Sequence, residues 1–319
     1  MVTSHNITVA LGGNALSDPT GRGTITQQFA RTRKTAAVLC DLLEAGHRLL
    51  ITHGNGPQVG SILRRVELSQ HEVYPIDLGL CVADSQAGMG YMIAQCMTNE
   101  LLKRGINRYA VAIVTTVQVH PDDPAFAEPT KPIGAFYSQE QARRHCEQDG
   151  WNMAEIPNRG FRRLAPSPKP LAIKEIRQIS RLHDDGELII ACGGGGVPVI
   201  WTQGWGYEGV EAVIDKDLCA ALLAVGVNAD LLVIVTDQDC IYERFGQPDQ
   251  KPIDRLTASQ ARARLDAGDF PAGSMAPKVQ AAVNFLSESG HPDARAIITS
   301  DTMLDQAIAG RAGTSIVRD

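Results

Sequence analysis

The sequence predicts an α/β fold whose mostly parallel sheet is covered by helices on both faces. Short apolar runs rich in β-branched residues alternate along the chain with longer segments of helical character. These runs are nearly continuous instead of alternating with polar residues, which is typical of strands buried on both faces. A long segment, 117–170, interrupts the alternation and indicates an inserted subdomain.

Six apolar runs are predicted to form the strands of this sheet. In chain order they are 7–11 (ITVAL), 48–52 (RLLIT), 110–116 (AVAIVTT), 187–192 (ELIIAC), 231–236 (LLVIVT) and 295–299 (RAIIT). The intervening helices are predicted at 33–45, 87–103, 215–225 and 278–289. Gly46 follows the first of them and is expected in the left-handed conformation that ends many helices.

The segment 117–170 is interpreted as a subdomain and not as a linker. It contains eight of the 17 prolines of the chain, which stiffen it and disfavour regular helices. It also carries enough large aromatic side chains to build a small core: Phe126, Phe136, Tyr137, Trp151 and Phe161.

Composition excludes several classes of protein. With 319 residues the chain can build two lobes, and its formal charge of −6 and pI of about 5.8 argue against nucleic acid as a partner. No apolar run approaches the roughly 20 residues of a membrane helix, so no membrane partner is expected. The seven cysteines are scattered without a C-x-x-C pair, which favours reduced thiols and a cytoplasmic location.

Glycine-rich loops follow three of the predicted strands. The first strand runs into Gly12-Gly13-Asn14, the second into 53–57 (HGNGP) and the fourth into 193–198 (GGGGVP). Open parallel sheets bind ligands beyond the carboxyl ends of their strands, and glycines let an anion approach backbone N–H groups. A single glycine loop is explained by turn formation alone, but three at strand ends indicate an anion site.

The familiar nucleotide motifs are absent from the sequence. It has no G-x-x-x-x-G-K-[ST], no spaced G-x-G-x-x-G after the first strand, no protein-kinase loop set and no G-x-S-x-G. A P-loop, a dinucleotide-binding fold and an α/β-hydrolase are therefore not supported.

Three lysines stand in settings that suit phosphoryl transfer. Lys216 lies between Asp215 and Asp217 at the start of a predicted helix, where Asp215 is the expected N-cap. Lys278 follows Ser274, a second candidate cap, and Pro277 in the first turn of another helix. Lys131 lies between two prolines of the insertion. Lys216 and Lys278 are each also compatible with an exposed lysine at a helix start, whereas a lysine stiffened by two prolines is unusual as an ordinary surface residue.

Phosphoryl transfer accounts for the three lysines together. Its transition state spreads negative charge over the equatorial oxygens, so positive charge and positioning matter more than covalent chemistry. A carboxylate such as Asp217 can orient the lysines. Mg²⁺ would bridge the nucleotide phosphates while keeping most of its water, so no dedicated metal site built from protein side chains is expected.

Several motifs together resemble the carbamate kinases, a branch of the amino-acid-kinase fold family. They are VALGGNAL (9–16), THGNGPQVG (52–60), SQAGMGYM (85–92), DPAF and PTKPIG (123–134), GFRR and PSPKP (160–170), GGGGVPV (193–199), EAVIDKDLCAALLA (211–224) and GSMAPKVQAA (273–282). They cover essentially the whole chain in the order of the family.

The resemblance implies a three-layer α/β/α sandwich with a protruding inserted subdomain. An acceptor-binding lobe would comprise residues 1–225 and a nucleotide-binding lobe 226–319, in a cytoplasmic homodimer. The implied activity is reversible phosphoryl transfer between carbamoyl phosphate with ADP and carbamate with ATP, in arginine catabolism, with Mg²⁺ bound to the nucleotide. The usual direction of the family makes ATP.

The resemblance also implies roles for individual residues. Carbamate and the transferring phosphoryl group would be held by Gly12, Gly13, Asn14, Gly54, Asn55 and Gly56. Lys131, Lys216 and Lys278 would stabilise phosphate oxygens, with Asp217 organising the lysines. Tyr242 and Met275, together with Lys216 and Lys278, would contact the nucleotide.

Two positions depart from the family pattern. Ala276 stands where GSMGPK is common, and Ala87 stands where SQGxxGY is usual. Two alternatives therefore stay open: a kinase of the same fold for another small carboxylate or amino acid, and a catalytically weak nucleotide-binding paralogue with a regulatory role. His53 is interpreted as a buried structural histidine, because carbamate oxygen is already anionic and needs no general base.

Overall fold

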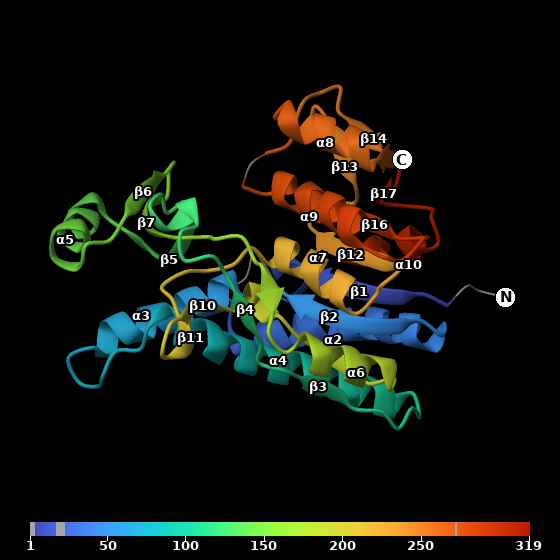
Figure 1. Cartoon of the computed structure of the whole chain (residues 1–319), viewed down its shortest axis with the longest axis horizontal. Coiled ribbons are helices and arrows are strands. Elements are labelled where there is room, and N and C mark those ends of the chain that lie inside the picture. Colours follow the sequence, from blue (N-terminus) through green and yellow to red (C-terminus); the bar gives the residue numbers. More distant parts are fainter. Residues whose placement is uncertain (1–3, 17–22, 272) are drawn as a thin grey trace.

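The computed structural model describes residues 4–16, 23–271 and 273–319. Its centre is an eight-stranded sheet in the order β15-β17-β16-β12-β1-β2-β9-β3 (Figure 1). The strands are β1 (Asn6–Leu11), β2 (Arg48–His53), β3 (Ala110–Ala112), β9 (Leu188–Ile190), β12 (Leu231–Thr236), β15 (Arg255–Thr257), β16 (Arg295–Ser300) and β17 (Thr314–Val317). All neighbours pair in parallel except β16 and β17, which confirms the predicted mostly parallel sheet.

Helices cover both faces of this sheet and produce the expected three layers. Alternate residues of β1 show the division: Ile7 and Val9 pack into one apolar core, and Ala10 packs into the other. The first core is shared with α2 (Ile25–Glu44), α4 (Leu78–Lys103) and α10 (Leu304–Ile308). The second is shared with α6 (Ile176–Asp184), α7 (Lys216–Gly226), α8 (Ala258–Asp266) and α9 (Met275–Glu288).

Two of the predicted helices begin earlier than expected. The predicted helix 33–45 starts at Ile25, because Thr24 and Gln27 form a capping box there. The helix predicted at 87–103 starts at Leu78 after the N-cap Asp77. Gly46 adopts the predicted left-handed conformation (φ +91°), directly after the first of these helices.

The predicted strand 110–116 is divided in the structure. The segment 110–112 joins the edge of the main sheet as β3, and β4 (Thr116–Gln118) belongs to a second sheet with the order β11-β10-β4-β8. Between them Gln86 of α4 donates to the Thr115 carbonyl and accepts from the Thr115 N–H, at 3.1 and 3.0 Å. The Thr115 carbonyl also accepts from Val197 at 2.9 Å, so the chain passes at this residue from the main sheet to the second sheet. The other members of the second sheet are β8 (Ala172–Ile173), β10 (Val197–Thr202) and β11 (Gly206–Gly209).

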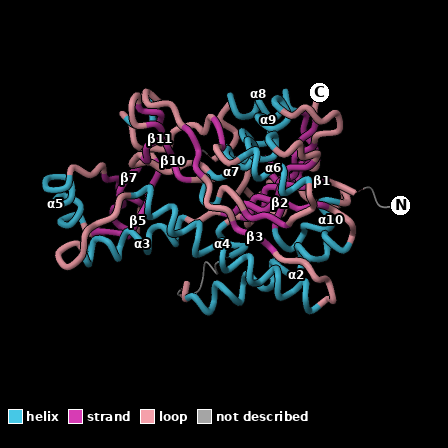
Figure 2. Tube along the Cα trace, turned by 60° about the horizontal axis from the view of Figure 1, so that its bottom comes forward, coloured by secondary structure: helices cyan, strands magenta, loops and turns pink. Residues whose placement is uncertain are grey.

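The inserted subdomain protrudes from the body and contains its own sheet. Its order is β5-β7-β6, with β5 (Lys131–Tyr137), β6 (Met153–Ile156), β7 (Gly160–Ala165) and the helix α5 (Gln139–Asp149). A second view shows α5, β5 and β7 at the end of the molecule away from the N-terminus (Figure 2). The residues of this sheet span 131–165, a shorter range than the predicted limits 117–170. The first residues of the predicted range belong to β4, which pairs with β10 in the second sheet.

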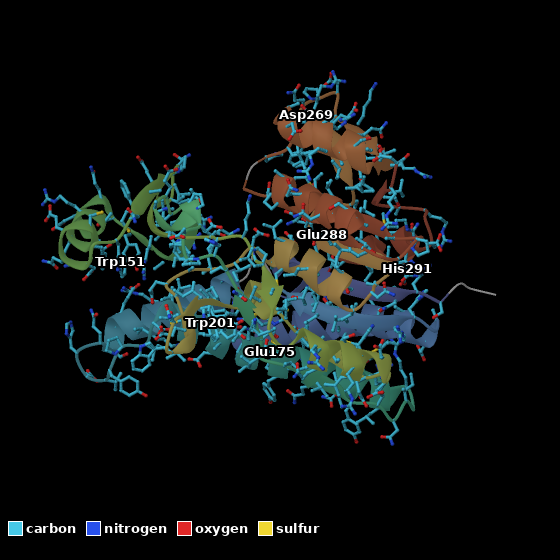
Figure 3. All side chains as sticks on the ribbon, viewed as in Figure 1. Trp151, Glu175, Trp201, Asp269, Glu288 and His291 are labelled. Carbon is cyan, nitrogen blue, oxygen red and sulfur yellow. The ribbon has the colours of Figure 1, made fainter. Side chains whose placement is uncertain are left out.

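Aromatic packing holds the subdomain together. Trp151, which lies in this subdomain (Figure 3), stacks on His145 with ring centroids 4.3 Å apart. Tyr137 meets the His145 ring edge-on at 4.9 Å. The Tyr137 hydroxyl donates to Glu67 of α3 (Gly56–Ser69) at 2.6 Å, which ties the subdomain to the body.

The remaining elements are short. They are α1 (Gly13–Leu16), η1 (Pro124–Phe126), η2 (Gly193–Gly195), η3 (Asp301–Met303) and the hairpin of β13 (Ile241–Glu243) with β14 (Lys251–Ile253). No helix in the described part of the chain has the length and apolar character to span a membrane.

Candidate active site

The first two glycine loops meet at the carboxyl end of the central strands. The Gly54 N–H donates to the Leu11 carbonyl at 3.0 Å, which joins the loop after β2 to the end of β1. A Cβ on Gly54 would lie 3.8 Å from the backbone nitrogen of Gly13, and one on Gly12 would lie 2.6 Å from the Val235 carbonyl oxygen. Glycine is therefore required at Gly12 for the close approach of β1 and β12.

The third glycine loop differs from its sequence-based interpretation. Its glycines were expected to expose N–H groups to an anion, but Gly195 and Gly196 donate within the loop, to the Cys192 and Gly193 carbonyls. A Cβ on Gly193 would lie 2.4 Å from the His53 ring, and one on Gly194 would lie 2.1 Å from the Asn55 amide. The glycines are thus needed for packing, and Gly194 to Gly196 also have positive φ.

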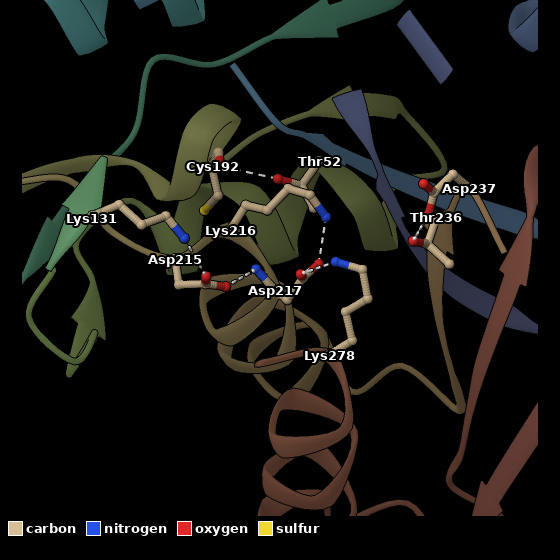
Figure 4. A network of polar contacts seen from close by, with 9 residues as sticks. All are labelled: Thr52, Lys131, Cys192, Asp215, Lys216, Asp217, Thr236, Asp237 and Lys278. Carbon is tan, nitrogen blue, oxygen red and sulfur yellow. Dashed lines mark hydrogen bonds and ion pairs between the residues drawn. The ribbon is translucent and has the colours of Figure 1, made fainter. Parts of the chain in front are cut away.

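A network of lysines and aspartates lies beside these loops, at the amino ends of α7 and α9 (Figure 4). Asp215 is the N-cap of α7, as predicted, and accepts from the Asp217 N–H at 2.9 Å. The Asp217 carboxylate receives the Lys216 ammonium on one oxygen and the Lys278 ammonium, at 2.9 Å, on the other. Asp217 therefore holds two cations that come from different helices.

Burial gives this cluster unusual electrostatics. The side chain of Asp217 is 4 % exposed, while those of Lys216 and Lys278 are 15 % and 14 % exposed. Burial alone raises the pKa of Asp217, but the Lys216 and Lys278 charges outweigh it and hold the pKa at about 2. Burial lowers the pKa of the Lys216 ammonium, an effect that Asp217 only partly offsets. The lysines are thus poised to interact with a further anion.

Lys131 reaches the same network from the subdomain. It is the first residue of β5, and its ammonium donates to the second oxygen of Asp215 at 2.9 Å. At 41 % exposure it is the most accessible of the three lysines. Figure 4 shows Lys131 entering from the side opposite to Lys278.

All three lysines line one pocket. The loop residues Gly54, Asn55 and Gly56 line it as well, and the full lining is Gly54, Asn55, Gly56, Val59, Lys131, Pro132, Ile133, Gly194, Val213, Ile214, Asp215, Lys216, Asp217, Gly273, Ser274, Pro277 and Lys278. The separate segments singled out in the sequence therefore converge in space.

Some of the predicted residues lie at other places. Among the described residues, Gly12 and Gly13 are not part of the pocket lining, although Gly13 adjoins Gly54. The side chain of Asn14 lies outside the described atoms. Tyr242 and Met275 line a neighbouring pocket, which shares Ser274 with the first.

The neighbouring pocket is apolar with a few polar groups at its edge. It is lined by Thr236, Asp237, Gln238, Ile241, Tyr242, Phe245, Asp269, Phe270, Pro271, Ser274 and Met275. Figure 3 shows Asp269 at the far end of the lobe that contains α9. An apolar cleft with a few polar groups suits a flat heterocyclic base.

The amino end of α9 lies between the two pockets. Ser274 occupies the predicted N-cap position but, within the described atoms, its side chain makes no capping hydrogen bond. Its backbone (φ −138°, ψ −71°) departs from the extended form of a capping residue. The Ala276 N–H of the first turn donates to the Pro271 carbonyl and Pro277 has no N–H, so an anion at this end would be favoured mainly by the helix dipole.

Asn55 is held by residues that the sequence did not single out as functional. It precedes α3, and its side-chain amide donates to the Ser85 hydroxyl at 2.6 Å. Ser85 in turn donates to the Val82 carbonyl at 2.7 Å within α4. Ser85 begins the motif SQAGMGYM, so the sequence could have indicated a functional role for it. That the Ser85 hydroxyl faces Asn55 is visible only in the folded structure.

The two departures from the family pattern lie in tolerant positions. Ala87 is exposed on α4, whereas Ser85 and Gln86 of the same turn are buried toward the site. Ala276 lies in the first turn of α9, packs against the apolar core and donates its N–H to the Pro271 carbonyl at 3.1 Å. Neither methyl group belongs to the lining of the lysine pocket in the described part of the chain.

Side chains that bind metal ions are scattered in the described part of the chain. Among residues 4–16, 23–271 and 273–319, no group of three or more His, Cys, Asp or Glu side chains is arranged to bind one. The most buried carboxylate of the site, Asp217, is occupied by two lysines.

His53 is buried at the end of β2, with 1 % of its surface exposed. Its Nδ1 lies 3.2 Å from the Gly54 carbonyl oxygen, and burial lowers the pKa of the ring to about 4. The histidine is therefore neutral at pH 7 and packs under the loop formed by Gly193.

This buried histidine predicts a loss of stability in acid. The unfolded chain takes up a proton near pH 6.5 whereas the folded chain does so only near pH 4, so stability falls as the pH drops through this window. The full effect is about 3 kcal/mol. In urea unfolding at pH 7 and pH 4, His53→Gln is expected to lose less stability than the wild type. The exposed control His71→Gln is expected to follow the wild type, and parallel losses in all three would contradict the assignment.

Comparison with known proteins places the chain among kinases. Residues 7–300 match the Amino acid kinase family. The chain is 41 % identical over 317 residues to a carbamate kinase of Thermococcus kodakarensis, covering 98 % of this chain and 99 % of that protein. It is 40 % identical to the carbamate kinase-like protein YahI of Escherichia coli, covering 98 % of each. A solved carbamate kinase from Giardia lamblia bound to AMP-PNP superposes with a TM-score of 0.92 at 36 % identity, over all of both chains.

Proposed function

Because the chain belongs to the Amino acid kinase family, we propose that it is a carbamate kinase that transfers a phosphoryl group between carbamoyl phosphate with ADP and carbamate with ATP. The observation that carries this proposal is the convergence of Lys131, Lys216 and Lys278 on one pocket. Its relatives support the choice of acceptor, since several are carbamate kinases along nearly their full length.

The nucleotide is proposed to span the two adjoining pockets. Its base enters the apolar pocket of Tyr242 and Met275, and its phosphates pass the uncapped amino end of α9 toward Lys278. The distal phosphate then lies among Lys278, Lys216 and Lys131. This arrangement divides the chain into an acceptor-binding lobe, residues 1–225, and a nucleotide-binding lobe, residues 226–319.

The acceptor is proposed to bind on the opposite side of the transferred phosphoryl group. Gly54, Asn55 and Gly56 form this side of the pocket, with Gly12, Gly13 and Asn14 beside them. The Gly54 N–H already donates to the Leu11 carbonyl, so the other backbone N–H groups of these loops donate to carbamate or phosphoryl oxygens. Asp217, the more buried carboxylate of the pocket, is already paired with both Lys216 and Lys278. It therefore offers no partner for the ammonium of an amino-acid acceptor, which favours a small acceptor without one.

The phosphoryl group is transferred by an in-line displacement at phosphorus, with the carbamate oxygen and the terminal ADP oxygen on opposite sides of it. In the direction that makes ATP, the bond between phosphorus and the carbamate oxygen breaks as the bond to the terminal ADP oxygen forms. The three ammonium groups stabilise the charge on the equatorial oxygens, and no side chain forms a covalent intermediate. Asp217 orients Lys216 and Lys278, and its own low pKa keeps it ionised throughout.

Mg²⁺ is proposed to enter as part of the nucleotide substrate. ATP-dependent kinases generally use Mg²⁺ to bridge nucleotide phosphates, and the ion keeps several of its waters while doing so. The chain then needs to supply cations for the transferred group instead of a dedicated cage of carboxylates.

A homodimer in the cytoplasm is proposed as the physiological form. The strand β3 lies at the edge of the main sheet, and exposed apolar side chains occur along it and next to it: Tyr109, Val111 and Val114. An exposed apolar edge of this kind is normally covered by a partner. Sedimentation is expected to give twice the chain mass of 34.3 kDa, and a monomer at all concentrations would reject the dimer. The seven free cysteines support a reducing compartment.

A coupled assay tests the proposed function. Purified protein with Mg²⁺, ADP and carbamoyl phosphate is expected to form ATP, while acetyl phosphate and an amino-acid acyl phosphate are poor donors. A higher rate with one of these donors would indicate a different acceptor. No ATP above the enzyme-free control with any donor would favour the catalytically weak nucleotide-binding paralogue.

A further inference from the structure

The side chain of Asp215 does two things at once. One carboxylate oxygen accepts from the Asp217 N–H at 2.9 Å and so caps α7. The other accepts from the Lys131 ammonium, also at 2.9 Å. Asp215 therefore joins the helix that carries Lys216 and Asp217 to the first residue of the subdomain strand β5 (Figure 4).

Capping does not require the negative charge of Asp215. Asparagine and serine cap helices about as well as aspartate, so the second oxygen is free for another purpose. The ion pair with Lys131 adds little to stability, because Lys131 is 41 % exposed and exposed pairs are weak. We therefore interpret the ion pair as a contact that sets the position of the Lys131 ammonium.

The charges around the pocket explain why placement is needed. Three lysines and two aspartates line it, and Asp217 is already shared between Lys216 and Lys278. Without the charge of Asp215, the Lys131 ammonium would face two neighbouring cations and one occupied carboxylate. Repulsion would then turn this half-exposed side chain toward solvent.

The subdomain itself does not fix the Lys131 ammonium. Its hydrogen bonds to the body are made by other residues. Tyr137 of β5 donates to Glu67, and Arg163 of β7 donates to Glu211. Two prolines fix the backbone on either side of Lys131, but the long side chain stays free to rotate. Asp215 is the acceptor that its ammonium has in the described structure.

We propose that Asp215 is a positioning residue that holds the Lys131 ammonium at the mouth of the pocket until the phosphoryl group of carbamoyl phosphate replaces it as the partner of Lys131. This inference rests on the proposed function. It assigns Asp215 a part in binding the phosphoryl donor, separate from its role as helix cap, and none in binding ADP, whose base lies in the other pocket.

The substitution Asp215→Asn separates the two roles, because asparagine keeps the cap and removes the charge. The KM for carbamoyl phosphate is expected to rise about 10-fold, because the charged contact between Asp215 and Lys131 is lost. The KM for ADP is expected to change less than about 2-fold. The melting temperature is expected to stay near that of the wild type. Asp215→Ser, which also caps, is expected to behave in the same way and replaces Asp215→Asn should that variant not fold.

A double-mutant cycle with Lys131→Met identifies the partner. Lys131→Met is expected to slow turnover while leaving ADP binding nearly intact, and adding Asp215→Asn to it is expected to cause no further loss. Full additivity of the two losses, or an equal rise of both KM values in Asp215→Asn, would overturn the inference and leave Asp215 a structural cap. A wild-type protein that forms no ATP would instead reject the proposed function, so the two failures are distinguishable.

Discussion

Replacing Asp217 with asparagine is expected to lower kcat by about 100-fold or more, because one side chain orients two of the three cations around the transferred group. Asparagine keeps one of the two oxygens, replaces the other with an NH2 donor and carries no charge, so one lysine loses its acceptor. Lys216 and Lys278 would then repel each other in a largely buried site. Initial rates of ATP formation with both substrates saturating measure this effect.

The same substitution is expected to reduce stability at neutral pH by about 2 kcal/mol or more, because it leaves two buried cations without their shared carboxylate. Burial already lowers the pKa of Lys216, and removal of Asp217 lowers it further. Stability should therefore recover as the pH rises and Lys216 loses its proton. Thermal unfolding at pH 7 and pH 10 measures the recovery.

The control for this variant is Asp249→Asn. Asp249 pairs with Arg244 where both side chains are at least half exposed, so its loss is expected to change neither rate nor stability measurably. Equal effects of the two substitutions, or an undiminished kcat in Asp217→Asn, would contradict the role given to Asp217.

Replacing Gly194 with alanine is expected to reduce kcat/KM by about 100-fold, since misplacement of a site residue by 1 Å can cost that much. The new Cβ would lie 2.1 to 2.4 Å from the three terminal atoms of the Asn55 side chain. Asn55 would be forced away from Ser85 and out of its place in the pocket lining. Steady-state kinetics with carbamoyl phosphate as the varied substrate measure the loss.

Gly150→Ala provides a matched control for backbone strain. Gly150 ends α5 with φ +67°, nearly the same as the +66° of Gly194, but no described atom lies within 4 Å of its Cβ position. Alanine there is expected to cost about 1 kcal/mol of stability without loss of activity. A Gly194→Ala enzyme as active as Gly150→Ala would show that Asn55 does not need its observed position.

The sequence contained enough information for the sheet and for most of the charged cluster. Buried parallel strands such as β12 have an unbroken apolar pattern that does not depend on their neighbours. Lys216 and Asp217 follow the N-cap Asp215 directly, so their place at a helix amino end could be read from local sequence. Lys131 was recognisable because prolines on both sides are unusual around an ordinary surface lysine.

Other features depend on contacts between distant segments and could not be predicted. The segment 110–116 is divided at Thr115, whose N–H donates to Gln86 and whose carbonyl accepts from Gln86 and from Val197 of the second sheet. The need for glycine at Gly194 comes from Asn55, which is 139 residues away in the chain (194 − 55). Ser274 occupies the predicted N-cap position, but its backbone is not extended there and its side chain makes no capping hydrogen bond among the described atoms, which local sequence could not indicate. The ion pair of Asp215 with Lys131 spans 84 residues.

The arrangement of one nucleotide across both pockets is most directly tested by a crystal structure of the protein with Mg²⁺ and an ATP analogue that cannot transfer its terminal phosphate. The adenine is expected beside Tyr242 and Met275, and terminal phosphate oxygens are expected within about 3 Å of the Lys216 and Lys278 ammonium groups. A terminal phosphate directed away from both lysines, or an adenine bound outside the apolar pocket, would contradict this arrangement.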